Sequence, residues 1–367
     1  MMKWYSMWYK LVVAVSLGVM LVASLQLSFV LAQEGTGTAE TAPVVDKPFE
    51  IGDIIVNTPP IEPILPLTYA RIISQQATAY GRITEAVELT LTPTREIKPG
   101  FIYVSLYDTN PISYNNELWY QINEGEYLQS SKLTPITPSV FHGVSLSRTP
   151  ETAFGWVVRK TAVLPTPGAE ATKETPYLSR YSMVTIYETK WFGEKAGWHR
   201  IGADQWVQSY NVGAVKPTTR PVGIPAGQKW VAVDLTEQSL AAYNENDQIL
   251  YGTLISSGLP GGPGWETPEG IFQIRSKVKA NKMSGGGMVD WYFLEDVSAT
   301  MYFTQSYAFH TAYWHDDFGR FKSHGCVNMT PQDAAWLFRW STPTLLPTDE
   351  KVKASATNPG TWIWVHK

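Results

Sequence analysis

A single cysteine constrains this chain more than any other feature. Cys326 is the one thiol in 367 residues, and it lies in the stretch 309–329, which reads FHTAYWHDDFGRFKSHGCVNM. A lone cysteine cannot form an internal disulfide, so it is a buried small side chain, an intermolecular bridge or a reactive nucleophile. Three of the six histidines, His310, His315 and His324, lie within sixteen positions of this thiol. An imidazole beside a thiol favours the nucleophile, because a free thiol is only slightly ionised at neutral pH.

The residues on either side of the thiol predict the local backbone. Gly325 permits a tight turn and close approach of a substrate, and the amides around it can donate to a developing oxyanion. The segment 330–333, TPQD, has a capping hydroxyl, a proline at the first helical position and an acid three residues past the cap. We therefore expect a strand from Met301 to Phe309, a loop, the thiol turn and then a helix.

These residues resemble the signature of the YkuD-type L,D-transpeptidases, which are bacterial cell-wall enzymes. The signature is His310 followed by SHGCVN at 323–328. Upstream, the segments similar to the family's opening hairpin, its S-x-G turn and its TP-x-G-x-F strand are WVAVDL at 230–235 with SLAAY at 239–243, SSG at 256–258 and TPEGIF at 267–272. Four motifs in the family's order argue against a chance match, and the resemblance runs from about Gln228 to Lys367.

The resemblance implies roles for particular residues. Cys326 is implied to be the acyl-accepting nucleophile and His310 the general base that takes its proton. Thr311 stands where relatives often have Gly or Ser, whose backbone carbonyl orients the base in some members. His324 and Gly325 are implied to frame the oxyanion pocket.

Three further site residues follow from the same resemblance. Asn328, where relatives carry Asn or Arg, and Ser323 are expected to bind substrate. Tyr292 is the candidate for a family tyrosine that helps to polarise the acyl oxygen, and it is chosen by its distance along the chain alone. The implied substrate is a peptidoglycan stem tetrapeptide, cut before its terminal D-Ala and joined to a second stem. Carbapenems are expected to acylate the same cysteine, and no cofactor or metal is expected.

The N-terminus predicts export. Residues 1–10 carry lysines and no acid, and residues 11–32 are almost wholly apolar, so 1–32 is interpreted as a signal peptide or a membrane anchor. The small residues before Gln33 fit a cleavage site, and both alternatives place the remainder in the cell envelope. Residues 33–66 are rich in Gly, Thr, Pro and acids, which predicts a flexible linker.

An internal repeat follows the linker. The segment 119–130, WYQINEGEYLQS, aligns without a gap onto 198–209, WHRIGADQWVQS, at an offset of 79 residues. Each copy reads as strand, tight turn, strand and resembles bacterial Src-homology-3-like (SH3-like) domains. The repeated aromatic residues are expected to pack barrel cores, and the barrels to bind the cell wall or to act as spacers.

The predicted fold class is mainly β. The expected order is two small SH3-like β-barrels, then a mostly antiparallel YkuD-like β-sandwich with one helix after the cysteine. The expected domains are barrels at 67–137 and 139–215, a Pro-rich linker at 216–227 and the catalytic domain at 228–367. The formal net charge of -4, with no basic cluster, argues against nucleic acid as a partner.

Other functions remain open from the residues alone. If water accepts the acyl group, the same residues make an L,D-carboxypeptidase. A papain-like peptidase would need its histidine after the cysteine, and only His366 follows Cys326. A zinc site is conceivable at the four His and Cys residues, but the spacing does not match common structural sites, and His315 is interpreted as a solvated loop residue. A wall-binding protein with an inactive thiol is the remaining alternative. The transpeptidase interpretation implies a role in cell-wall organisation and cell shape.

Overall fold

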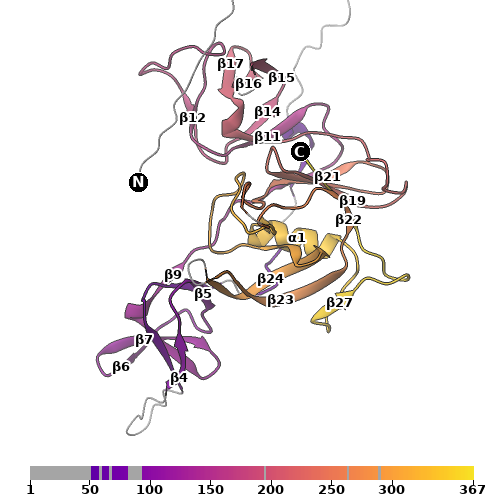
Figure 1. Ribbon diagram of the computed structural model, residues 1–367. Helices are drawn as coiled ribbons and strands as arrows, with labels where there is room; N and C mark the ends of the chain where they lie inside the picture. The colour runs from indigo at the N-terminus through magenta and orange to yellow at the C-terminus, as the bar shows by residue number, and fades with distance from the viewer. Residues whose placement is uncertain are drawn as a thin grey trace, which may run out of the picture. The chain divides into compact units, whose positions relative to one another are not determined.

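The computed structural model describes residues 51–57, 60–65, 68–81, 93–193, 196–262, 264–287 and 291–367 (Figure 1). The predicted leader and the first part of the predicted linker lie outside this range. No helix within it is long and apolar enough to cross a membrane. The described residues belong to one compact unit.

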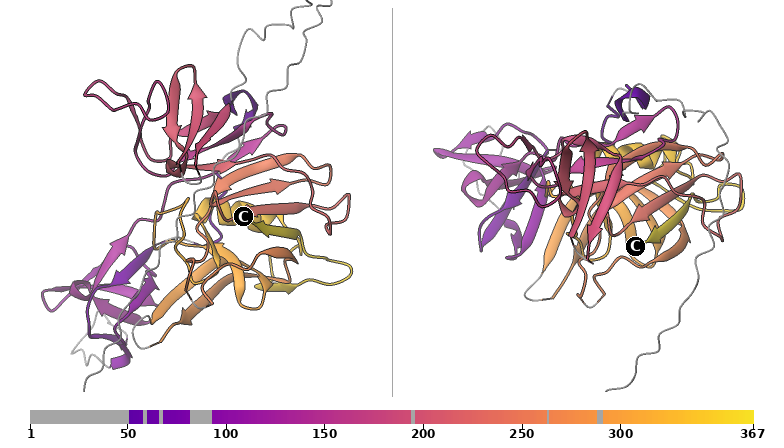
Figure 2. Two further views of the ribbon diagram at one scale, coloured as in Figure 1. Left: turned by 45° about the horizontal axis from the view of Figure 1, so that its top comes forward. Right: turned by 90° about the horizontal axis from the view of Figure 1, so that it is seen from above.

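Two β-sheets form a sandwich in the C-terminal part of the chain, which Figure 2 shows in colours from salmon to yellow. The strands of the first sheet include β19 (Trp230–Asp234), β20 (Ser239–Tyr243), β21 (Ile249–Leu254), β22 (Gly270–Gln273) and β28 (Trp362–His366). Those of the second include β23 (Ser276–Gly285), β24 (Tyr292–Thr304), β25 (Tyr307–Thr311), β26 (Val327–Met329) and β27 (Lys351–Lys353). Most pairs are antiparallel, so the predicted sandwich is confirmed.

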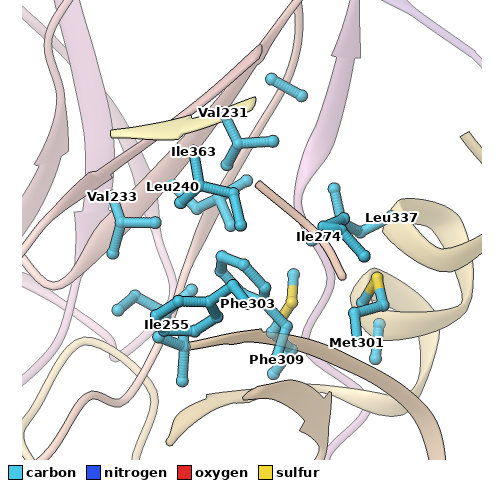
Figure 3. Packing of buried hydrophobic residues seen from close by; sticks show 14 of the residues in the cluster. Val231, Val233, Leu240, Ile255, Ile274, Met301, Phe303, Phe309, Leu337 and Ile363 are labelled. Carbon is cyan, nitrogen blue, oxygen red and sulfur yellow. The ribbon is translucent and has the colours of Figure 1, made fainter. Parts of the chain in front are cut away.

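The core lies between these sheets and beneath the helix α1 (Pro331–Trp340) (Figure 3). Alternate residues of each strand point inward, as expected for a sheet with one face on a core. The side chains that meet there include Val231, Val233, Leu240 and Ile363 from the first sheet, Met301, Phe303 and Phe309 from the second, and Leu337 from the helix.

Helix α1 begins as the sequence predicts. The Thr330 hydroxyl accepts a hydrogen bond from the Asp333 amide, and Pro331 takes the first helical position. The Asp333 carboxylate also reaches beyond the cap. It is buried and accepts from the Gly143 amide at 2.8 Å, the Tyr251 hydroxyl at 2.7 Å and the Thr253 hydroxyl. The start of the helix is thereby tied to the first sheet.

The internal repeat has the same local structure in both copies. The first copy is β7 (Glu117–Asn123), β8 (Glu126–Gln129) and the 3-10 turn η2 (Ser130–Lys132); the second is β16 (Ala196–Gly202), β17 (Gln205–Gln208) and η3 (Ser209–Asn211). The strand registers coincide at the same offset, including an irregularity before Asn123 and before Gly202. Of the repeated aromatic residues, Trp119, Trp198 and Trp206 are buried as expected, whereas Tyr127 is only partly buried.

The two predicted barrels do not close among the described strands. In the first module, β3 (Ala77–Gly81), β4 (Pro93–Ile97), β6 (Ile112–Tyr114), β7 and β8 form one sheet, whereas β2 (Tyr69–Ile72), β5 (Phe101–Ser105) and β9 (Leu133–Ile136) join the second sheet of the sandwich. The second module has three small sheets, made by β11 (Ala153–Val157) with β14 (Met183–Ile186) and β18 (Val212–Val215), by β12 (Thr161–Ala162) with β13 (Tyr177–Leu178), and by β15 (Glu188–Phe192) with β16 and β17. Strand β5 pairs with β24, so its edge is covered by the sandwich.

Part of the predicted linker is wrong. Residues Ile51–Ile54 form the 3-10 turn η1, and β1 (Ile55–Val56) pairs with β10 (Val144–Leu146), which pairs with β21. Ile51 and Ile54 are buried in the cluster that contains Trp230. Burial of the apolar side chains of IGDIIV lowers the free energy of this folded arrangement, whereas an extended, solvent-exposed segment would leave them in water. Strand β10, placed by the sequence in the second barrel, likewise belongs to the sandwich.

The predicted strand Met301–Phe309 is also wrong in its extent. Strand β24 ends at Thr304 and β25 begins at Tyr307, and the two pair as an antiparallel hairpin. Gln305 has a φ of 41°, which makes the reversal. The polar Thr304-Gln305-Ser306 sequence interrupts the apolar pattern at this point.

A partly buried charge network joins the first module to β24. Arg95 forms ion pairs of 3.1 Å with Glu126 and with Glu295, and the Ser105 amide donates to Glu295 at 3.3 Å. Burial raises the pKa of Glu295, and the charge of Arg95 opposes that shift. The ion pair with Arg95 therefore offsets the free-energy cost of keeping the Glu295 carboxylate ionised.

We expect Arg95→Met to lower the free energy of unfolding by about 2–3 kcal/mol at pH 7, because it leaves Glu295 buried without its cation. The loss should shrink as the pH falls toward 4, since the uncompensated carboxyl can then take a proton. Urea unfolding at several pH values measures both effects. Arg71→Met, at an exposed position of the same module, is the matched control. Equal losses for the two variants would contradict this account.

Candidate active site

The parallel pairing of β25 with β26 builds the centre of the site. Phe309 pairs with Val327 and His310 with Asn328. Phe309 and Val327 point into the core, so His310 and Asn328 share the opposite face. Cys326 lies in the bend directly before β26. Its thiol donates to the Ser306 carbonyl at 3.7 Å and lies beside the Ala308 amide.

The position of the His310 ring is set by a backbone carbonyl. Its Nδ1 lies 3.0 Å from the Thr311 carbonyl oxygen, so Nδ1 carries the proton and donates. Nε2 is then left as the acceptor, which is the state that a general base requires. The Thr311 hydroxyl accepts from Ser298 at 3.0 Å, which fixes the residue that supplies the carbonyl.

The loop that carries the thiol is closed by its own serine. The Ser323 hydroxyl accepts from the Gly325 amide at 3.0 Å and donates to the Cys326 carbonyl. The sequence led us to expect Ser323 at the substrate, but its hydroxyl is engaged within the loop and its side chain is buried. The Gly325 amide is engaged too, so it is not free to donate to an oxyanion as expected.

Only glycine fits at position 325. Its φ is +113°, and an added Cβ would lie 2.3 Å from the Tyr307 ring. Its carbonyl accepts from the Thr267 hydroxyl at 2.8 Å, and that hydroxyl accepts from the Gly258 amide at 3.0 Å. The S-x-G turn and the TP-x-G-x-F strand thus meet at the thiol loop.

Aromatic rings line the other side of the thiol. The His324 ring stacks on Trp265 at a centroid distance of 4.3 Å and meets the Tyr292 ring edge-on at 5.6 Å. Tyr292 and Tyr302 both lie close enough for a charge on Cys326 to raise their pKa values, although burial is the larger cause. Both phenols are therefore protonated donors at neutral pH.

Sequence reasoning missed four of the residues around the site, namely Trp265, Thr267, Tyr302 and Tyr307. Tyr302 pairs with Ala308 across the hairpin, and the Ala308 amide lies beside the thiol. Pairing these two strands from the sequence would therefore have placed Tyr302 near Cys326. Its hydroxyl accepts from the Asn281 amide at 2.6 Å. The stacking of Trp265 on His324 depends on a long-range contact that no local pattern contains.

His315 is not the solvated loop residue that we expected. Its ring lies 4.8 Å from the Phe318 ring, and its Nε2 lies 3.0 Å from the Asn328 side-chain amide. Burial lowers its pKa to about 4. Asn328 is itself only 2% exposed. The sequence HDD suggested exposure, but the chain folds back so that this imidazole covers Asn328.

Burial favours the neutral form of both the thiol and the imidazole. It raises the pKa of Cys326 to about 11 and lowers that of His310 to about 4. These shifts favour a thiol and a neutral imidazole over a thiolate–imidazolium pair.

A zinc site receives no support from the geometry. Within the described ranges, no three His, Cys, Asp or Glu side chains come together as a metal ion would require. The three histidines near the thiol have different partners. His310 contacts a backbone carbonyl, His315 an asparagine amide and His324 an indole ring.

Comparison with known proteins identifies the C-terminal domain. Residues 228–365 match the family model YkuD, described as the L,D-transpeptidase catalytic domain. The family assignment made from the motifs is thereby confirmed, whereas the SH3-like character of the preceding modules is not. No curated protein matches this chain.

Several solved structures match part of this chain. An L,D-transpeptidase from Stackebrandtia nassauensis is 23% identical over 38% of this chain and 56% of its own, with a TM-score of 0.26. The catalytic domain of an E. faecium L,D-transpeptidase is 24% identical over 38% and 98%, with a TM-score of 0.29. The L,D-transpeptidase LdtMt1, solved in complex with imipenem, is 18% identical over 50% and 90%, with a TM-score of 0.31. The match thus spans little more than half of the Stackebrandtia chain.

We expect iodoacetamide to alkylate Cys326 more slowly at pH 7.5 than it alkylates free cysteine, because a raised pKa leaves little thiolate. The rate should rise about tenfold per pH unit and continue to rise beyond pH 9. Mass spectrometry of the alkylated protein gives the rate directly, since the chain has no other thiol. A rate that is constant from pH 5 to 9 would show a resting ion pair and contradict the expectation.

Proposed function

We propose, from the premise that residues 228–365 carry a YkuD-type L,D-transpeptidase catalytic domain, that this protein cross-links peptidoglycan stem peptides in the cell envelope through a thioester on Cys326. One observation carries the proposal. His310 lies on β25 and Cys326 directly precedes β26, the strand that pairs with β25; the Nδ1–H of His310 is engaged by a carbonyl, which leaves Nε2 available to act as the base.

The first half-reaction forms the acyl-enzyme. His310 Nε2 takes the proton of Cys326, and the sulfur attacks the carbonyl carbon of the diamino acid in the donor stem. The carbonyl electrons move onto oxygen and return as the C–N bond to the terminal D-residue breaks. The leaving amine takes the proton from the His310 imidazolium, and a thioester remains on the sulfur.

The second half-reaction regenerates the thiol. A side-chain amine of a second stem attacks the thioester carbon and passes a proton to His310, and the C–S bond breaks as the new amide forms. The thiolate then recovers its proton from His310. With water as the acceptor the same steps give an L,D-carboxypeptidase, and the two outcomes share every residue named here.

We propose Tyr292 as a side-chain donor to the oxyanion. Its phenol lies near Cys326, and burial keeps the hydroxyl protonated by raising its pKa. The Gly325 amide donates to Ser323 and is therefore not available to an oxyanion. A side-chain donor is then more important for stabilising the oxyanion than the sequence suggested. His324 sits between Tyr292 and Trp265 and holds the phenol ring in place.

The first module supports this site directly. Strand β5 pairs in parallel with Tyr292–Leu294, and the Phe101 amide donates to the Trp291 carbonyl at 2.9 Å. Tyr69 stacks on Tyr313, three residues after the base, at a centroid distance of 3.5 Å. We therefore include this module in the catalytic unit. Binding of cell wall by either module remains a proposal that these contacts do not address.

The decisive experiment is mass spectrometry of the protein with a stem tetrapeptide or a carbapenem. We expect a covalent adduct on Cys326 and loss of the terminal D-residue from the peptide. A carbapenem is a reasonable probe because LdtMt1 was solved with imipenem. Addition of a second stem should release the peptide adduct as a cross-linked dimer. Absence of any adduct at Cys326 would overturn the proposed function and leave the wall-binding alternative.

Cys326→Ala and His310→Ala should each abolish turnover of the tetrapeptide, because one removes the nucleophile and the other its base. Cys326→Ala should leave the melting temperature nearly unchanged, since the thiol makes a single weak hydrogen bond. Turnover by chromatography and melting by differential scanning calorimetry test the two statements. A large melting shift with residual turnover would indicate a structural thiol.

Gly325→Ala should reduce turnover by about 100-fold, because the added methyl meets Tyr307 and displaces the thiol loop. Gly261→Ala is the matched control: its φ is also positive, at +80°, but an added Cβ meets nothing within 4 Å. The ratio of the two kcat/KM values separates a displaced loop from general strain at a positive φ. Equal losses would contradict the prediction.

A further inference from the structure

The segment 312–322, which joins the base to the thiol loop, is held against the second module by two arginines. Arg180 forms an ion pair of 3.4 Å with Asp316. Arg320, near the other end of the segment, donates to the Val158 carbonyl at 3.2 Å. One of these arginines belongs to the second module and the other to the segment, so the contact brings cations from both sides together.

Four cations meet at this contact, and we call them the basic cluster: Arg159, Arg180, Arg320 and Lys322. Asp316 pairs with Arg180, and Asp317 pairs with Lys322 at 2.7 Å. The other two members form no ion pair within the part of the chain that the structure describes. Four cations against two carboxylates leave a local excess of two positive charges.

The charges of the basic cluster lie close enough to act on one another. Arg320 is half-buried, and this burial lowers its pKa. The positive charges of Arg159 and Arg180 lower that pKa further, and the negative charge of Asp317 opposes them only in part. An anion bound by the cluster would relieve this repulsion. A carboxylate suits it well, because the planar guanidinium of an arginine can donate to both carboxylate oxygens at once.

The basic cluster adjoins the loop that carries the proposed nucleophile. The Lys322 amide donates to the Ser257 carbonyl at 2.9 Å, and the next residue, Ser323, pairs with Gly258. The Ser323 hydroxyl in turn donates to the Cys326 carbonyl. One end of the cluster is thus fixed to the backbone that positions the thiol.

We infer that Arg159 and Arg320 bind a carboxylate of the stem peptide whose acyl group is transferred to Cys326. This inference rests on the proposed function, because it names the part of the donor peptide that the two arginines recognise. Arg159 lies in the second module and Arg320 in the catalytic domain. The second module therefore takes part in binding the donor, in addition to its contacts with the sandwich.

The groups around the thiol do not supply this countercharge. Burial lowers the pKa values of His310 and His315 to about 4, which favours their uncharged forms. Tyr292 and Tyr302 are protonated phenols, because burial raises their pKa values. A carboxylate held among these groups alone would lose its hydration without gaining a cation. The basic cluster offers it a cation and is itself only partly buried.

Calorimetry with a pair of tetrapeptides tests the inference, in the Cys326→Ala background so that no turnover occurs. One peptide keeps its carboxylates, and in the other each carboxylate is converted to an amide. Amidation should raise the Kd about tenfold, because the charge-assisted hydrogen bonds to the arginines are lost. In the double variant Arg159→Gln/Arg320→Gln, the acid peptide should bind about tenfold more weakly and amidation should have no further effect. An effect of amidation that persists at full size in the double variant would overturn the inference.

Two single variants distinguish loss of the site from loss of structure. Arg159→Gln changes an exposed side chain that forms no hydrogen bond with any residue that the structure describes, so the melting temperature should stay the same. The Kd for the acid peptide should nevertheless rise about threefold. Arg71→Gln removes one exposed positive charge from the first module and should leave the Kd unchanged. Equal changes in Kd for the two variants would show a general effect of net charge and would overturn the inference.

The outcomes separate the inference from the proposed function. Acylation of Cys326 in protein that retains the thiol, with a Kd that does not depend on the basic cluster, would overturn the inference alone. A preference for the acid peptide that depends on the cluster, without acylation of the thiol, would support the carboxylate site and overturn the proposed reaction. Failure of both peptides to bind would overturn both.

Discussion

The parallel pairing of β25 with β26 is the interaction on which the rest of the site depends. It joins two segments that lie more than ten residues apart and sets His310 beside Asn328, directly after the loop that carries Cys326. Their other faces are buried in the sandwich core, so a shift of register by one residue would turn His310 into the core. The hydrophobic pattern of Phe309, Val327 and Met329 therefore positions the proposed base and the loop that carries the proposed nucleophile.

Burial gives this site its chemical character. The same desolvation that lowers the pKa of His310 raises that of Cys326, which favours the neutral form of both groups. The thiolate is the reactive species, so a raised thiol pKa slows alkylation and oxidation of Cys326.

The N-terminal modules are integrated with the sandwich to different extents. The first module extends the second sheet through β5 and shares the Arg95–Glu295 ion pair with β24. The region between η1 and β10 extends the first sheet through β1. A deletion chosen at the boundaries that the sequence suggested, such as 67–137 or 139–215, would therefore remove strands of the catalytic sheets. Such a deletion would not simply detach a spacer.

Local patterns in the sequence determined a large part of this protein. The cap at Thr330, the repeated strand–turn–strand unit and the alternating core residues of β19 and β20 depend on neighbours within a few positions, and they were predicted. The family assignment followed from ordered motifs, which are equally local. Only the tertiary structure decided the partner of β5, the burial of Ile51, the use of the Gly325 amide by Ser323 and the contact of His315 with Asn328. Each of these is a choice between partners far apart in the chain or between competing hydrogen bonds, and its free energy depends on packing that no local pattern records.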